Sequence, residues 1–81
     1  MTYAVRVSVM PKPGIADPQG QTIERALPAL GFGGVSRVRV GKRIDLDLEA
    51  ADRDVARAVA AEMCERLLAN TVLETFEIEV R

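Results

Sequence analysis

Histidine is absent from this chain of 81 residues, and cysteine occurs only once. Histidine is the commonest general acid or base near neutral pH and the commonest zinc ligand, so its absence argues against acid-base catalysis and against a metal cluster. The lone Cys64 cannot form an internal disulfide, which fits a reducing compartment. It falls on an apolar helical stripe with no imidazole to activate it, so we interpret it as an inert core thiol. We therefore expect no catalytic residue, no metal and no cofactor held by this chain.

Aromatic residues are also scarce, since Tyr3, Phe32 and Phe76 are the only three. A globule of this size buries only about 60% of the surface that its unfolded chain exposes, and large aromatic side chains usually anchor such a core. We therefore expect association with a second copy or with another protein.

Excess charge of one sign and long apolar runs are missing as well. The 11 Lys and Arg residues nearly balance the 12 Asp and Glu residues, which gives no electrostatic reason to expect nucleic acid as a partner. No run of eighteen or more apolar residues occurs, and the N-terminus lacks the pattern of a signal peptide. We expect a cytoplasmic protein that binds neither nucleic acid nor membrane.

The first half of the chain contains clear signals for one strand and one helix. Alternating apolar residues predict a strand over Tyr3–Val9. Asp17 is a helix cap and Pro18 suits the first helical position. The helix that they begin should end at Gly31, with a kink or an early end at Pro28. Its apolar positions have the spacing of a buried stripe: Ile23, Ala26, Leu27 and Leu30.

A hairpin is predicted next, from a strand over Val35–Val40 and a strand in which Ile44, Leu46 and Leu48 alternate with acids. Turning the chain across Gly41, Lys42 and Arg43 pairs apolar residues with apolar residues. In that register Arg39 lies opposite Asp45, and Arg37 opposite Asp47.

A second helix is predicted over Arg53–Ala69, with Asp52 as its cap and Asn70 ending it in a left-handed conformation. Its apolar positions form one continuous stripe: Val55, Ala56, Val59, Ala60, Met63, Cys64 and Leu67. A final strand holds Phe76, Ile78 and Val80. The order strand, helix, strand, strand, helix, strand predicts one α+β domain over residues 1–81, a ferredoxin-like β-α-β-β-α-β sandwich. Its antiparallel sheet carries two helices on one face, and we expect the sheet to continue across a dimer because its edges are open.

Two motifs that suggest phosphate binding fail on inspection. Gly41-Lys42 lacks the glycine and the hydroxyl residue of a phosphate-binding loop, and Gly31-Phe32-Gly33-Gly34 is typical of a helix end. The alternating acids of the strands are typical of a half-solvated sheet. The basic cluster of Arg37, Arg39, Lys42 and Arg43 is interpreted as a solvated face.

Taken together, these segments resemble the PurS family, the small subunit of phosphoribosylformylglycinamidine synthase, nearly from end to end. The most specific run is Met63-Cys64-Glu65 with Leu67-Leu68-Ala69-Asn70-Thr71-Val72. Further matches are Lys12-Pro13-Gly14, Asp17-Pro18-Gln19-Gly20, Ala26-Leu27, Leu30-Gly31-Phe32, Val38-Arg39-Val40-Gly41-Lys42 and Asp52-Arg53-Asp54. Pro11, where leucine is common, and Pro28 depart from the pattern.

The resemblance implies a non-catalytic role in purine synthesis, in the step that converts formylglycinamide ribonucleotide to its amidine with ATP and glutamine. In the family a glutaminase subunit, PurQ, releases ammonia, a synthetase subunit, PurL, consumes it, and PurS dimers bridge the two. ATP and magnesium are then expected on the synthetase. The partners implied are a second copy, in a dimer or tetramer, with PurQ and PurL.

The resemblance and expected exposure together make Gly41, Lys42, Arg43, Asn70 and Thr71 the candidate partner contacts, although each of these residues could equally be fold-forming. The alternative function is a small-molecule-binding regulatory domain of the ACT kind, which has the same order of elements. An RNA-binding ferredoxin-like domain would need stacking aromatics on its central strands, and these are missing.

Overall fold

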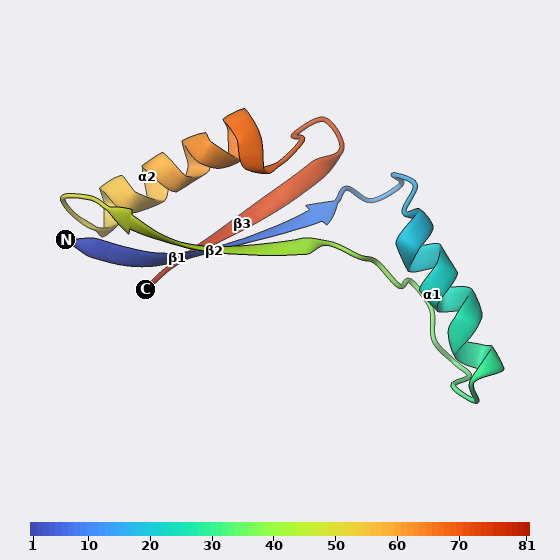
Figure 1. Ribbon diagram of the computed structural model, residues 1–81. Helices are drawn as coiled ribbons and strands as arrows, with labels where there is room; N and C mark the ends of the chain where they lie inside the picture. The colour runs from blue at the N-terminus through green and yellow to red at the C-terminus, as the bar shows by residue number, and fades with distance from the viewer.

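A computed structural model describes residues 1–81 and shows a three-stranded antiparallel sheet with one long helix on it (Figure 1). The elements follow the order β1 (Thr2–Pro11), α1 (Pro18–Ala29), β2 (Lys42–Glu49), α2 (Arg53–Met63), the π-helical turn η1 (Cys64–Leu68) and β3 (Glu74–Val80). The strand order is β2-β1-β3. The predicted α+β class and antiparallel sheet are confirmed. None of the helices combines the length and the apolar character needed to cross a bilayer.

The core forms where the apolar face of the sheet meets α2. Val5, Val7 and Val9 of the central strand β1 are fully or almost fully buried. The register sets Val7 opposite Ile44 of β2 and Ile78 of β3, so the apolar residues of all three strands share one face. Ala56, Ala60 and Cys64 close the core from the helical side. The alternating apolar residues of the strands and the apolar stripe of the second helix therefore bury one another, as the sequence predicts.

Both predicted helix caps are present. The Asp17 carboxylate accepts a hydrogen bond from the Gly20 amide at 3.0 Å, and the Asp52 carboxylate accepts one from the Val55 amide at 2.8 Å. The helix α1 ends at Ala29, one residue after Pro28, which confirms the predicted early end. Gly31 follows with φ of 97°.

The predicted strand over Val35–Val40 is wrong, and so is its hairpin with the next strand. Residues 35–40 are extended but belong to no sheet, and β2 pairs with β1 instead. Competing acceptors explain the difference. The amide of Val38 donates to the Glu24 carboxylate at 2.9 Å, and the amide of Val40 donates to Asp17 at 2.8 Å. These side chains take the donors that a strand would use in a ladder.

The predicted cross-strand ion pairs are consequently absent. Asp45 does not face Arg39 but pairs with Arg6 of β1 at 3.0 Å and with Arg43 at 3.3 Å. Arg37 does not face Asp47, and it adopts a left-handed conformation with φ of 56°, which interrupts the extended chain.

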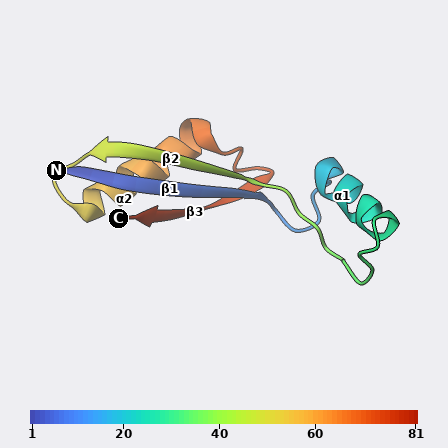
Figure 2. The same ribbon diagram turned by 60° about the horizontal axis from the view of Figure 1, so that its bottom comes forward.

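The expectation of two helices on one face of the sheet is also wrong for a single chain, because only α2 lies there. Figures 1 and 2 show α1 projecting beyond the Pro11 end of β1, joined to the sheet by two connecting segments. Its predicted buried stripe is accordingly open, with Ile23 42% and Leu30 72% exposed. We call residues 12–41 the arm and the remainder the body. The spacing of the stripe predicts an apolar surface, but it does not say which surface covers it.

The second helix reaches Leu68, close to the predicted end, but its last turn is a π-helix. The Ala69 amide donates to the Cys64 carbonyl five residues earlier, at 2.9 Å. This wider turn buries Cys64 and Ala69 while it leaves Leu67 82% exposed. The left-handed end predicted at Asn70 is wrong, since Arg37 is the only residue other than glycine with a positive φ.

The Asp17 carboxylate should make the order of the arm sensitive to acid. Hydrogen bonds from the amides of Gly20 and Val40 lower its pKa from the usual 3.8. Because this pKa is depressed in the folded state, the stabilisation is complete well above pH 3.8 and is lost as pH falls through the folded pKa. We expect the amide proton shifts of Gly20 and Val40 to titrate together in NMR spectra, with a midpoint below 3.8. In the control Asp17→Ala neither amide should titrate, and a shared midpoint at or above 3.8 would contradict the assignment.

Candidate subunit interface

The five candidate contact residues fall into two groups that the sheet brings to the same end. Lys42 pairs with Val9, and Glu74, just after the Asn70 corner, pairs with Pro11. The Lys12 amide also donates to the Leu73 carbonyl at 2.9 Å. The segments 41–43 and 70–73 therefore flank the last residues of β1, on opposite sides of it, although they are far apart in the sequence.

Gly41 is a close-packed junction and not the hairpin turn that the sequence predicts. A Cβ atom there would lie 2.2 Å from the Met10 sulfur and 2.3 Å from the Val9 carbonyl oxygen. Only a hydrogen fits at this place, where the arm rejoins the sheet. The lack of a side chain at Gly41 therefore fixes the path by which the chain returns from the arm into the sheet.

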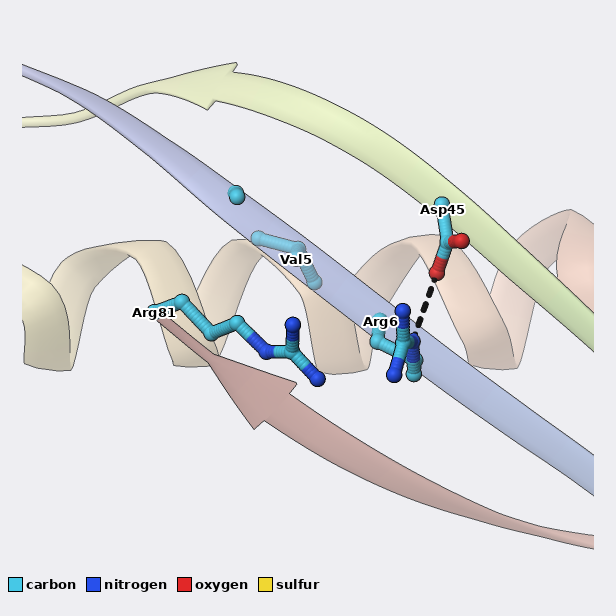
Figure 3. Close-up of a pocket in the computed structure, with 5 residues that line it drawn as sticks. Val5, Arg6, Asp45 and Arg81 are labelled. Atoms are coloured by element: carbon cyan, nitrogen blue, oxygen red, sulfur yellow. Dashed lines mark hydrogen bonds and ion pairs between the residues drawn. The ribbon is translucent and has the colours of Figure 1, made fainter.

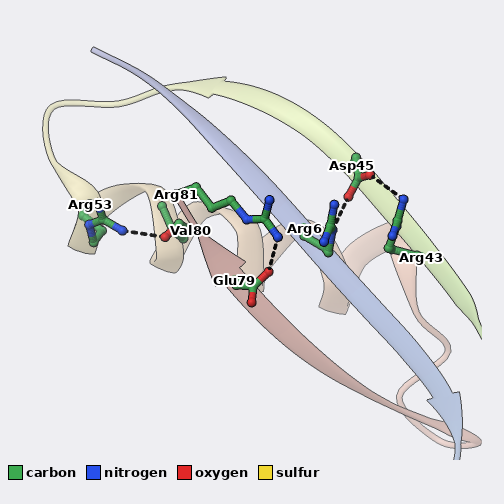
Figure 4. A network of polar contacts seen from close by, with 7 residues as sticks. All are labelled: Arg6, Arg43, Asp45, Arg53, Glu79, Val80 and Arg81. Carbon is green, nitrogen blue, oxygen red and sulfur yellow. Dashed lines mark hydrogen bonds and ion pairs between the residues drawn. The ribbon is translucent and has the colours of Figure 1, made fainter.

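Lys42 and Arg43 begin β2 with exposed side chains. Figure 4 shows Arg43 and Arg6 converging on Asp45 from two strands of the open face of the sheet. The hydrogen bond from Arg6, with a smaller effect from Arg43, lowers the pKa of the Asp45 carboxyl. Arg43 is thus partly engaged within the chain, whereas Lys42 is free to meet a partner.

Asn70 and Thr71 show the same contrast between a side chain engaged within the chain and one that is free. Asn70 builds the corner into β3: its side-chain oxygen accepts from the Val72 amide at 3.1 Å, and its carbonyl accepts from the amides of Leu73 and Glu74. Thr71 is exposed and makes no hydrogen bond through its hydroxyl. Asn70 is therefore fold-forming, and Thr71 is surface.

An apolar groove of about 560 Å³ runs along α2 and η1 next to this corner. Its lining residues are Val59, Glu62, Met63, Arg66, Leu67 and Leu68. Val72, 76% exposed, adds apolar surface at the same end. The sequence prediction missed this surface because it assigned Leu67 to the buried stripe. An α-helical period cannot reveal the π turn that directs Leu67 outward.

A second cleft, of about 510 Å³, separates the start of the arm from its return. Three cationic residues line it, Lys12, Arg37 and Arg39, together with Asp17. Both carboxylate oxygens of Asp17 already accept hydrogen bonds from the backbone amides of Gly20 and Val40. The charged side chains left at the rim of the cleft are therefore cationic.

The remaining polar sites are shallow features of the open face. One of them has a volume of about 190 Å³ and is lined by Val5, Arg6, Asp45 and Arg81, among others. Figure 3 shows the Arg81 side chain extending toward Arg6, which pairs with Asp45. Cys64 is fully buried, and burial raises the pKa of its thiol, which keeps it in the unreactive protonated form. No three acidic or cysteine side chains are grouped so that they could hold a metal ion. This end of the sheet is suited to contact with another protein, and no nucleophilic side chain described above is paired with a general base.

Comparison with known proteins decides the family. The model of the PurS family, described as phosphoribosylformylglycinamidine (FGAM) synthase, matches residues 4–81. The chain belongs to the PurS family. The resemblance read from the sequence is thereby confirmed, and it covers the arm as well as the body.

Individual PurS proteins agree in sequence and in fold. The PurS subunit of phosphoribosylformylglycinamidine synthase from Synechocystis is 43% identical over 79 residues, which cover 98% of this chain and 79% of that protein. The crystal structure of PurS from Bacillus subtilis matches with a TM-score of 0.86 at 43% identity over 98% of both chains. The structure of PurLQS from Thermotoga maritima contains a chain that matches with a TM-score of 0.90 at 32% identity, over 100% of this chain and 99% of that one.

Replacing Gly41 should test the close-packed junction. We expect Gly41→Ala to lower the free energy of unfolding by about 1–3 kcal/mol, because the added methyl must displace the backbone of β1. Urea titration at a fixed protein concentration measures this. Gly33→Ala is the matched control, since its Cβ would meet nothing within 4 Å and its φ is ordinary. Equal stability of the two variants would show that the junction can relax.

Proposed function

We propose that this chain is the PurS subunit of phosphoribosylformylglycinamidine synthase, a non-catalytic subunit that links the glutaminase PurQ to the synthetase PurL. The observation that carries the proposal is the full-length match to a chain of the PurLQS structure, at a TM-score of 0.90. Membership of the PurS family over residues 4–81 supports it. The reaction converts formylglycinamide ribonucleotide to the amidine with ATP and with ammonia from glutamine.

The role of this chain is to position its partners. It offers no histidine, and its one thiol is buried. Ammonia that escapes to water is diluted and protonated, so a subunit that holds glutaminase and synthetase together raises the effective concentration of ammonia at the second site. ATP and magnesium belong to the synthetase, and the assembled enzyme works in the cytoplasm.

The contact surface that we assign to this role is the Pro11 end of the sheet. It combines the exposed Leu67 and Val72 with Lys42 and Thr71, which were predicted from the sequence as partner contacts. An apolar centre with a polar rim is the usual composition of a protein interface. Gly41 and Asn70 support this surface by shaping the backbone, and Arg43 borders it.

Reconstituted synthase tests the assignment. With PurQ and PurL present, Leu67→Glu should lower glutamine-dependent amidine formation at least about tenfold, because it places a charge in an apolar contact. Activity with added ammonium salt should remain, because it does not need transfer from PurQ. Ala51→Glu is the matched control, at an exposed position just before the other end of α2, and should retain both activities.

The same assay applied to Lys42→Ala and Thr71→Ala separates contact from fold. Both side chains are exposed, so neither change should alter the unfolding midpoint. Reduced glutamine-dependent activity at unchanged stability supports a contact, and full activity of both variants removes them from the surface. If the wild-type chain itself gives no increase in glutamine-dependent activity, or if it binds an amino acid tightly in calorimetry, the bridging function fails.

A further inference from the structure

The cationic cleft at the start of the arm is not part of the contact surface assigned to PurQ and PurL. Its volume is about 510 Å³. Residues 12–15, where the chain leaves the sheet, and residues 37–39, where it returns, form its walls together with Asp17 and Gln21. Neither of the glycine motifs set aside in the sequence analysis lies in it. Sites that hold small molecules have volumes of about 300–1,000 Å³, so this cleft is large enough for one.

The three cationic residues of the cleft have no acidic partner within the chain. None of the ion pairs in the structure includes Lys12, Arg37 or Arg39. The one acid of the cleft, Asp17, is occupied by two backbone amides. Three positive charges and one negative charge give the cleft a formal charge of +2, whereas the whole chain has −1. Attraction for an anion is therefore local to this cleft and is not a property of the whole surface.

The backbone on both sides of Arg39 is fixed by side chains of the arm itself. The Val38 amide donates to the Glu24 carboxylate at 2.9 Å, and the Val40 amide donates to the Asp17 carboxylate at 2.8 Å. An arginine on a fixed backbone loses less conformational freedom on binding than one on a mobile loop. The cleft thus presents its guanidinium groups from an ordered segment.

Arg37 has a backbone conformation that an arginine rarely adopts. Its φ is 56°, and no other residue except glycine has a positive φ. This left-handed conformation is unfavourable for a residue with a Cβ atom, and residues strained in this way are concentrated at active sites and ligand sites. Since Arg37 lines the cleft and forms no ion pair within the chain, its conformation points to a contact with a molecule outside the chain.

We propose that this cleft binds a phosphomonoester, with Arg37, Arg39 and Lys12 around the phosphoryl group. A phosphomonoester has a charge of about −1.5 to −2 at pH 7, which matches the +2 of the cleft. Guanidinium groups donate paired hydrogen bonds to phosphoryl oxygens, and the Lys12 ammonium adds a point charge. Ile15 and Gln21 line the remainder of the cleft, where the organic group lies. This binding does not depend on the bridging of PurQ and PurL.

An NMR titration of the ¹⁵N-labelled full chain with ribose 5-phosphate, at constant ionic strength, tests the site. The amide signals of Gly14, Val38 and Arg39 should shift to saturation, with half-saturation at or below about 1 mM, while those of β3 stay in place. Inorganic phosphate should bind at least about threefold more weakly, because it leaves the apolar wall at Ile15 uncovered. Glutamate should bind at least about tenfold more weakly, because a carboxylate has less charge. Absence of saturable shifts, or equal affinity for either comparison anion, overturns the proposal.

Arg39→Gln tests the cationic wall against the control Arg25→Gln. Both variants remove one positive charge from an exposed position of the arm, but Arg25 lies outside the cleft. Arg39→Gln should weaken the binding of ribose 5-phosphate at least about tenfold, because a hydrogen bond to a charged group is lost. Arg25→Gln should stay within about twofold of wild type, because salt screens a distant charge.

Lys12→Gln is the second cleft variant and replaces Arg39→Gln in the comparison if the urea midpoint shows that Arg39→Gln has altered the fold. It removes the point charge and leaves both guanidinium groups, so we expect a loss of at least about threefold in affinity. Wild-type affinity of both cleft variants, or an equal loss of affinity in Arg25→Gln, overturns the proposal.

Discussion

The contact between the valines of β1 and the small residues of α2 and η1 is the constraint on which the rest of this structure depends. Val5, Val7 and Val9 lie in the only strand with two neighbours, and Ala56, Ala60 and Cys64 lie above them. Alanine and cysteine let the helix approach the sheet closely, so that short side chains fill the space. With no buried aromatic ring, this thin core holds one helix and three strands, and nothing is left in it to hold the arm.

The residues that carry local signals were readable from the sequence. Alternation predicted the three strands that form, and Asp17 and Asp52 predicted the helix starts, because each pattern depends on a few neighbours in the chain. The strand at Val35–Val40 was wrong because its donors bind Asp17 and Glu24, which a strand propensity does not consider. The stripe of α1 was recognised as apolar, but its spacing holds no information on whether the covering surface belongs to the same molecule.

The candidate interface was predictable only in part, for a related reason. The sequence predicted contacts in two segments, around Lys42 and around Thr71, and strand pairing brings both segments to the Pro11 end of β1. Within them it could not separate Asn70, which closes a corner with its own hydrogen bonds, from Thr71, which faces solvent. Leu67 was missed because one π turn displaces it from the helical period. In this chain of the PurS family, local backbone conformation thus determines which residues reach the candidate interface. Residue identity alone does not predict it.

The two carboxylates that fasten the returning segment to α1 have an energetic consequence for association. Asp17 and Glu24 fix the geometry of the arm through hydrogen bonds within a single chain, which need no contact from a neighbour. The conformational entropy of these residues is therefore lost in the folding step, and a preorganised recognition element enters the encounter. A floppy extension with the same apolar side chains would have to lose that freedom on docking, and its affinity would be lower by the same free energy.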